Sequence, residues 1–216
     1  MNTIATMSSE PLDSTVAVTT VATPLGPMHV ASISAGVCAA VFDDRREALE
    51  PRLRRMFGPF FRVVTGDPLD AASRLRDYYA GAFGALAGLP LATAATPLQR
   101  RVWAMVSALP VGTLSTYAAL ADRLGMPRAQ RAIGVCLATN PVPVFIPCHR
   151  VVAASGGLGS HPGGVARKRW LLRHEGALAT TDLTVARERR GRLRPSPALD
   201  PRETVELLNL PSVVGY

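Results

Sequence analysis

The sequence predicts an α/β protein of the α+β kind, with a small β-rich N-terminal region and a mainly helical C-terminal region. Short β-branched or apolar runs separated by turn-forming residues occupy residues 15–42, which is typical of strands. Apolar residues recur at helical spacing over much of the rest. The chain has 216 residues, of which 48% are hydrophobic and 19% charged, so it can bury a sizeable core.

Turn-forming residues divide the β-rich region into three short runs. Pro24, Gly26 and Gly36 separate them, so a small antiparallel sheet is expected. The expected strands are residues 15–23, 27–34 and 36–42, the expected helices that follow are 45–57 and 69–83, and 89–95 is a connector.

Helices dominate the C-terminal region. Gly125 lies between two short helical segments, which favours a helix-turn-helix, although many helical domains contain such a turn. The expected helices are residues 97–109, 115–124, 127–139 and 167–175, with a buried strand at 144–146 and a Gly-rich loop at 155–164. The predicted organisation is a disordered leader (1–13), the β-rich subdomain (14–93), the helical domain (94–178) and a tail (179–216) without an assigned role.

Positive charge is concentrated in the helical region. The net charge of the chain is +8, and residues 94–176 carry ten basic but only two acidic side chains. This pattern favours a polyanion such as DNA, although a basic face kept for solubility explains the charge alone equally well. Arg128 and Arg131 stand beside the small residues Ala129, Ala132 and Gly134, so this helix can approach a nucleic acid closely or simply pack on a neighbouring helix.

Three widely spaced cysteines fit no disulfide framework and no zinc-ligand pattern. The N-terminus lacks a secretory signal, and no apolar run approaches the length of a membrane span. The expectations are a cytoplasmic protein with free thiols, no membrane contact, no metal and no cofactor. Cys38 and Cys136 lie in apolar stretches and are interpreted as core residues.

Cys148 lies in a different context, because His149 and Arg150 follow it directly. A neutral histidine can accept a thiol proton if a third group orients its ring, and Glu175 is one of just two carboxylates in residues 94–176. The sequence therefore suggests a Cys-His-Glu site. The alternative is a surface Glu175 that pairs with Arg173.

The segment Ile146-Pro-Cys-His-Arg-Val151 resembles the active-site signature of the 6-O-alkylguanine-DNA alkyltransferases, also called methylated-DNA–protein-cysteine methyltransferases. The resemblance is strong over residues 94–178 and looser over 15–93, where the β-rich start is similar to the family's ribonuclease-H-like N-terminal domain. Further matching segments are Gln99-Arg-Arg-Val-Trp103, Gly112-Thr-Leu-Ser-Thr-Tyr-Ala-Ala-Leu-Ala121, Arg131-Ala-Ile-Gly134, Asn140-Pro-Val-Pro143 and Trp170-Leu-Leu-Arg-His-Glu-Gly176.

The resemblance implies DNA repair by direct reversal. Cys148 would take the alkyl group from 6-O-alkylguanine, with 4-O-alkylthymine as a second candidate substrate, in one irreversible step without turnover. His149, acting through a water, and Glu175 would make and hold the thiolate. Asn140 would brace the backbone, and Tyr117 would donate to the departing guanine. The implied partner is double-stranded DNA with alkylated bases, bound by a monomer.

Further roles follow from the same resemblance. Arg131 would fill the gap left by the flipped base. The helix that carries Arg128, Ala129, Ala132 and Gly134 would lie in the minor groove, where sequence readout is poor. The substrate pocket would be lined by Pro143, Val151, His161, Pro162 and Gly163.

Three positions depart from the family pattern. His161 stands where a tyrosine is usual, Pro162 where a small residue is usual, and Ala154 where a small hydroxyl residue often lies. Proline lacks a backbone N–H, so this stretch loses one donor. The departures bear on rate and on the range of alkyl groups, and they leave the nucleophile untouched.

Two other functions compete with alkyl transfer. The first is a lesion sensor or transcription regulator with poor transfer, which would not need Cys148, His149 and Glu175 together. The second is a cysteine hydrolase, which would leave the basic helix-turn-helix unexplained and for which the sequence offers no oxyanion-hole pattern.

Overall fold

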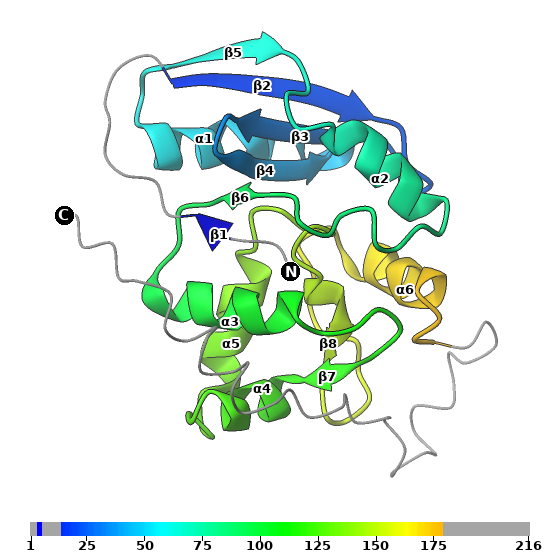
Figure 1. Cartoon of the computed structure of the whole chain (residues 1–216). Helices are drawn as coiled ribbons and strands as arrows, with labels where there is room; N and C mark the ends of the chain where they lie inside the picture. The colour runs from blue at the N-terminus through cyan, green and yellow to red at the C-terminus, as the bar shows by residue number, and fades with distance from the viewer. Residues whose placement is uncertain (1–3, 6–13, 179–216) are drawn as a thin grey trace. The chain divides into compact units, whose positions relative to one another are not determined.

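Two units make up the part of the chain that the structure, a computed structural model, describes, namely residues 4–5 and 14–178 (Figure 1). The first unit runs up to Thr96 and also includes the later segment 141–145. The second unit contains residues 97–140 and 146–178. The predicted tail, and most of the predicted leader, lie outside the described residues.

A six-stranded mixed sheet forms the first unit. Its strand order is β1-β6-β4-β3-β2-β5. β2, β3 and β4 pair antiparallel in sequence order, which confirms the three predicted strands. The strands are β1 (Ile4–Ala5), β2 (Ser14–Val21), β3 (Met28–Ile33), β4 (Gly36–Phe42), β5 (Phe61–Thr65) and β6 (Leu91–Ala92).

Three strands were not expected, and all of them pair parallel. β5 joins β2 at one edge, while β6 pairs with both β4 and β1. β1 lies within the stretch predicted to be disordered, and β6 within the predicted connector. Parallel pairing needs a long crossover, so its partners are distant in sequence and local patterns do not reveal them. The predicted small antiparallel sheet is therefore present as β2, β3 and β4, but it is the middle of a larger mixed sheet.

The centre of the sheet is covered by α1 (Leu49–Phe57). Every residue of β3 and β4 is buried, and Leu53 of the helix is 2% exposed. The predicted helix 45–57 is in fact two pieces, because a 3₁₀ segment, η1 (Asp43–Ala48), precedes α1 and Arg45 has a non-helical backbone. The second predicted helix is shorter than expected and ends in turns; it is α2 (Ala71–Tyr79).

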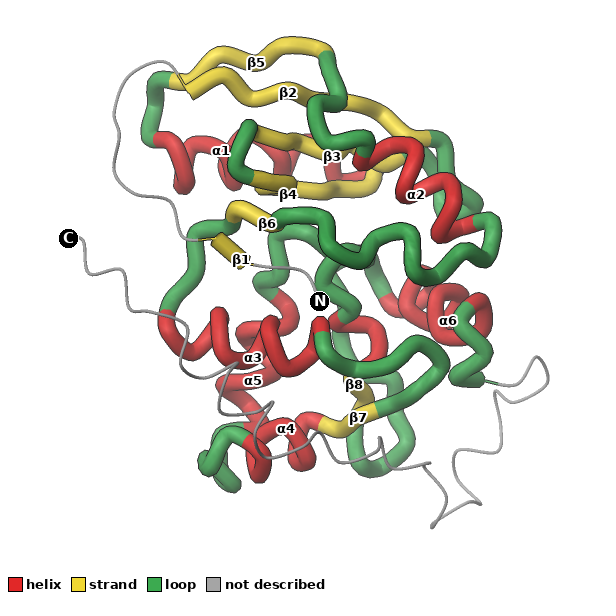
Figure 2. The backbone as a smooth tube through the Cα atoms, in the orientation of Figure 1, coloured by secondary structure: helices red, strands yellow, loops and turns green. Residues whose placement is uncertain are grey.

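Helices dominate the second unit, as Figure 2 shows by colour. Among the described residues of this unit, the only paired strands are the short strands β7 and β8. Its elements are α3 (Pro97–Ser107), β7 (Ser115–Thr116), α4 (Tyr117–Arg123), α5 (Gln130–Ala138), η2 (Cys148–Arg150), β8 (Val151–Val152) and α6 (Val165–His174).

The helix-turn-helix is present as α4 and α5. Thr116 caps α4 by accepting a hydrogen bond from the Ala119 N–H at 3.0 Å, so the helix begins two residues later than predicted. α5 packs on both α3 and α4. The buried Trp103 of α3 anchors it, since the indole N–H donates to the Cys136 carbonyl at 2.9 Å.

The predicted strand 144–146 is wrong. Val144 and Phe145 form a turn between single bridge residues, and Val144 has a φ of 78°, which a β-branched residue in a regular strand does not adopt. The two prolines of this segment had suggested an extended path, but the chain turns there. The Pro141 carbonyl instead accepts from the Ala40 N–H at 2.8 Å and from the Arg52 guanidinium at 3.2 Å, which ties the segment to the first unit.

No helix in the described part of the chain is long and apolar enough to cross a membrane.

Candidate active site and nucleic-acid interface

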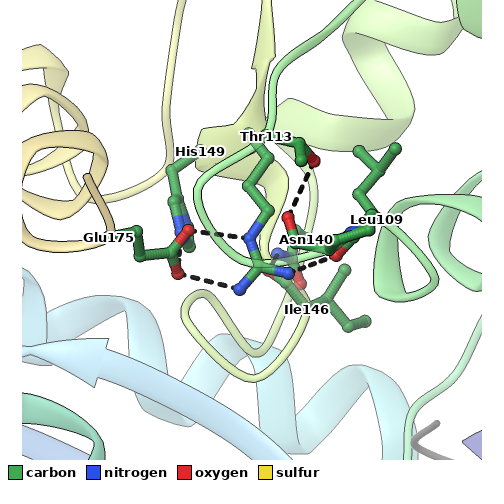
Figure 3. A network of polar contacts seen from close by, with 8 residues as sticks. Leu109, Thr113, Asn140, Ile146, His149 and Glu175 are labelled. Carbon is green, nitrogen blue, oxygen red and sulfur yellow. Dashed lines mark hydrogen bonds and ion pairs between the residues drawn. The ribbon is translucent and has the colours of Figure 1, made fainter. Parts of the chain in front are cut away.

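Cys148 begins the 3₁₀ turn η2 and is 2% exposed. Its sulfur accepts a hydrogen bond from the Asn140 amide, with Nδ2 and Sγ 3.1 Å apart. The same amide group donates to the Ile146 carbonyl at 2.9 Å (Figure 3). Asn140 is fully buried. It therefore joins the end of α5 to the backbone just before the cysteine and to the sulfur itself.

The Cys148 thiol is not ionised in this environment. Burial raises its pKa to about 11, although the Asn140 hydrogen bond and the charge of Lys168 both act to lower it. The resemblance implied that His149 and Glu175 make and hold the thiolate. Because desolvation favours the thiol at rest, its proton must leave during reaction.

His149 and Glu175 meet in the core of the second unit (Figure 3). His149 Nε2 lies 2.9 Å from Glu175 Oε1, and both side chains are fully buried. Burial lowers the pKa of His149, so the ring is neutral. A carboxylate only accepts, so Nε2 carries the proton and Nδ1 is left as the acceptor. Nδ1 is buried without a hydrogen-bond partner among the described residues. A neutral acceptor thus stands on the residue next to the nucleophile.

Arg150 completes this network, and the sequence interpretation gave it no role. Its guanidinium donates to both carboxylate oxygens of Glu175 at 2.8 Å and to the Leu109 carbonyl at 2.5 Å. Burial alone would raise the pKa of Glu175, but the hydrogen bonds and charges of His149 and Arg150 together lower it. Glu175 is therefore an ionised, buried carboxylate, and its pairing as a surface residue with Arg173 is not what the structure shows.

Lys168 is a second residue that the sequence interpretation missed. It is fully buried in α6, and its ammonium donates to the Val151 carbonyl at 2.6 Å and to the Ser160 carbonyl at 3.4 Å. Burial lowers its pKa to about 8, and the charge of the Cys148 thiolate opposes that shift. The signal available was that Lys168 is the sole lysine of an arginine-rich chain.

Tyr117 approaches the cysteine because of a two-stranded pairing. Thr116, directly before it, pairs with Val152, and Ser115 pairs with Val151. Burial raises the pKa of Tyr117, and the nearby Cys148 charge adds to this effect. The tyrosine hydroxyl packs against Gly159, where an added Cβ would lie only 2.6 Å from it. Glycine at this position makes room for the ring.

The predicted pocket residues do not all belong to one unit. Val151 is fully buried in β8, and His161 is 8% exposed beside it in the second unit. The His161 and His149 rings are edge-to-face, with centroids 6.4 Å apart. Pro162 is partly exposed and Gly163 is buried in the same loop. Pro143 belongs to the segment 141–145 of the first unit.

The predicted DNA-binding residues are split between a turn and a helix. Arg131 is exposed in the first turn of α5, whereas Ala132 and Gly134 are half-buried. Arg128 and Ala129 precede the helix, which begins at Gln130 and not at residue 127 as predicted. The proline at 127 starts a turn there. Val135 on the same helix is 58% exposed, an apolar side chain that the sequence interpretation did not single out.

No group of three or more histidine, cysteine, aspartate or glutamate side chains in the described residues is arranged to hold a metal ion. All three cysteines are free and buried. A basic helix-turn-helix unit with a buried cysteine, held beside a neutral histidine and an ionised glutamate, defines a DNA-binding protein that carries its own nucleophile.

The comparisons with known proteins agree with this class. The model of the 6-O-methylguanine DNA methyltransferase DNA-binding domain matches residues 97–177. A methylated-DNA–protein-cysteine methyltransferase of Shigella flexneri is 38% identical over 73% of this chain and 94% of its own length. One from Mycobacterium bovis is 34% identical over 77% and 96%. The chain belongs to the methylated-DNA–protein-cysteine methyltransferase family.

Solved structures show the same fold. The crystal structure of Mycobacterium tuberculosis O6-methylguanine methyltransferase is similar with a TM-score of 0.63 and 32% identity, over 79% of this chain and 98% of that one. A structure of Mycobacterium tuberculosis OGT in complex with DNA has a TM-score of 0.60 and 28% identity, over 74% and 92%. The α/β fold with a β-rich N-terminal part and a helical C-terminal part is thereby confirmed.

Proposed function

We propose that this protein repairs DNA by direct reversal, moving the alkyl group of 6-O-alkylguanine onto Cys148 once per molecule. The observation that carries the proposal is the surroundings of the sulfur. Cys148 is buried, its Sγ accepts a hydrogen bond from Asn140, and the adjacent His149 is neutral with an open Nδ1. The family membership supplies the substrate class.

Alkyl transfer to Cys148 can be written as a balanced reaction without a cofactor. The Cys148 thiol loses its proton to His149 Nδ1 through a bridging water, and Glu175 stabilises the imidazolium that forms. The sulfur then attacks the alkyl carbon, a C–S bond forms, and the C–O bond to guanine breaks with its electron pair going to O6. The guanine takes up one proton, so the net change is the exchange of the alkyl group and the thiol hydrogen.

Asn140 and Lys168 favour the transition state of this step. Both the N–H of Asn140 and the charge of Lys168 lower the pKa of Cys148, so they stabilise the negative sulfur that burial disfavours. Tyr117 lies close enough for the Cys148 charge to help raise its pKa, and its protonated hydroxyl would donate to the departing guanine. These groups are preorganised, which is the main source of electrostatic catalysis.

Double-stranded DNA is the proposed partner. The exposed Arg131 and Arg128 offer phosphate contacts and a side chain that can fill the space of the flipped base. The small residues Ala132 and Gly134 let α5 approach a minor groove closely, with Ala129 at its start. We propose a monomer that works in the cytoplasm, a reducing compartment that suits three free thiols.

The product is a thioether, which the site has no means to hydrolyse, so each molecule acts once. The alternative function is a lesion-binding regulator that transfers poorly. The same experiment separates the two, because a regulator binds the alkylated duplex without gaining its alkyl group.

The deciding experiment is the intact mass of the protein after incubation with a duplex that contains one 6-O-methylguanine. We expect one added methylene mass per molecule in the wild type, none in Cys148→Ser, and an unchanged gain in the control Cys38→Ser. Tight binding to the lesion without any mass gain would contradict alkyl transfer and favour the regulator.

A further inference from the structure

The loop that carries His161 has no free backbone N–H group at residues 162–164. Pro162 has no N–H. The Gly163 N–H donates to His161 Nδ1 at 3.0 Å, and the Gly164 N–H donates to the His161 carbonyl at 2.9 Å. Residues 162–164 therefore present no open backbone donor to a bound base. Any hydrogen bond that this stretch gives to a substrate has to come from a side chain.

The tautomer of His161 follows from the same contact. A backbone N–H can only donate, so Nδ1 must be the acceptor and the ring proton sits on Nε2. Burial lowers the pKa of His161 to about 3, and the charges of Lys168 and Arg167 act in the same direction, while the backbone of Gly164 opposes them. The ring is thus neutral at physiological pH, with its one proton on Nε2.

His161 Nε2 is buried and has no hydrogen-bond partner among the described residues. The side chain is 8% exposed, so water does not readily satisfy this donor. A buried donor without a partner costs free energy, of the order of 1–3 kcal/mol, and such groups recur at functional sites. The ring lies edge-to-face with His149, whose backbone neighbour is the nucleophile. The unused donor therefore belongs to a ring that packs against His149 of the Cys-His-Glu network.

We propose that His161 Nε2–H donates a hydrogen bond to the guanine O6 atom while the alkyl carbon passes to Cys148. This inference deepens the proposed function and rests on it. As the C–O bond breaks, its electron pair and the negative charge collect on O6, and the His161 N–H stabilises that charge. The proton stays on Nε2 throughout, so His161 is a hydrogen-bond donor to the leaving group and not its acid.

Two substitutions separate the two ring nitrogens of His161. In His161→Asn the amide oxygen can replace Nδ1 as the acceptor for the Gly163 N–H, but the donor at the Nε2 position is lost. In His161→Gln the amide nitrogen reaches the Nε2 position, but the acceptor for Gly163 is lost. A structural role and a catalytic role therefore predict opposite outcomes for this pair.

The measurement is the single-turnover rate of methyl transfer from a duplex with one 6-O-methylguanine, at saturating protein. We expect His161→Asn to be about 100- to 1000-fold slower than the wild type, as for the loss of one donor to a developing oxyanion. His161→Gln should stay within about threefold of the wild type. Affinity for the lesion, measured in the Cys148→Ser background, should change little with His161→Asn.

The matched control is His174→Asn, which removes a ring that stacks on Trp170 with centroids 4.7 Å apart. It should leave the rate unchanged. If His161→Asn transfers as fast as the wild type, or if His161→Gln is the slow variant, the proposal is overturned. Thermal unfolding of both variants shows whether either of them has a folding defect. If His161→Asn does not fold, the transfer rate of a folded His161→Gln still tests the proposal, because a slow rate contradicts it. Absence of transfer by the wild type would instead refute the proposed function itself.

Discussion

Two buried cysteines, one in each unit, show what distinguishes a reactive thiol from a structural one. Cys38 lies in β4 at the centre of the sheet and is fully buried, while Cys148 is 2% exposed. Burial raises the pKa of Cys38 to about 12 and that of Cys148 to about 11. By burial and by acidity the two thiols are nearly alike.

They differ in the side chains around the sulfur. The Cys38 thiol donates to the Ala31 carbonyl at 3.3 Å, and the groups that act to lower its pKa are backbone hydrogen bonds at Cys38 and Ala39. The Cys148 sulfur accepts from the Asn140 amide at 3.1 Å and lies near the Lys168 charge, both of which favour the anion. A reactive cysteine in a dry core is thus marked by groups that can stabilise negative sulfur, more than by a low resting pKa.

Removing the charge of Glu175 should give the largest effect. Glu175→Gln leaves the Arg150 guanidinium buried without its counter-charge, and we expect a loss of about 3–5 kcal/mol in the free energy of unfolding. Urea unfolding at pH 7 measures it. The pKa of Glu175 is lowered from its ordinary value of 4.5, so this stabilisation is present above that pH and lost as the pH falls, and the two proteins should converge in acid.

The matched control is Glu50→Gln, whose ion pair with Arg54 in the first unit is exposed. It should change the unfolding free energy by less than about 1 kcal/mol. Equal losses in the two variants would mean that the buried network around His149 is no more sensitive than a surface pair.

Asn140→Leu tests the hydrogen bond that Cys38 lacks. Without the amide donor the negative sulfur loses a charge-assisted hydrogen bond, so methyl transfer should slow about 10- to 100-fold. Single-turnover kinetics at saturating duplex measure this, with Gln99→Leu as control, which removes an exposed amide that donates to the Thr139 hydroxyl at 3.1 Å. A wild-type rate for Asn140→Leu would show that this hydrogen bond serves the fold alone.

Lys168→Gln tests the charge near the sulfur. Because the thiol proton passes to neutral His149 within the site, the wild-type rate should change little with pH up to about pH 8 and then fall, as Lys168 loses its proton there. The variant should be about tenfold slower at pH 7, and its rate should not fall near pH 8. A fall at the same pH in both proteins would exclude Lys168 as its cause. Selective labelling of this sole lysine lets NMR follow its titration directly.

Cys38→Ala should give the smallest effect on transfer, namely none. The variant removes a thiol whose hydrogen bonds are all with the backbone of the first unit, so we expect a stability loss of about 1 kcal/mol and an unchanged transfer rate. The intact-mass assay and thermal unfolding measure the two quantities. A slowed transfer would show that the two units are energetically coupled.

The sequence was informative where function is local along the chain. The hexapeptide at Cys148 and the segments around Asn140 and Glu175 singled out residues that the structure brings into contact, since Asn140 donates to the sulfur and Glu175 accepts from His149. The small antiparallel sheet was also readable, because β2, β3 and β4 are joined by short turns.

What the sequence did not reveal depends on contacts between distant residues. Arg150 and Lys168 are two of the 24 arginine and lysine residues of the chain. Only their burial in the structure distinguishes them from solvated basic residues. The parallel pairing of β5 with β2 rests on partners some 47 residues apart in register, such as Ser14 and Phe61. The turn at Val144 was misread as a strand because an apolar, β-branched run fits both.

The near-complete burial of Cys148 has a consequence for the protein before it ever meets a lesion. Small electrophiles and oxidants dissolved in the cell react with exposed, ionised thiols, and a molecule that can react once would be wasted on them. A sheltered thiol with a pKa of about 11 is nearly inert to such reagents. The burial that makes the Cys148 sulfur harder to ionise therefore also protects the unreacted protein from these reagents.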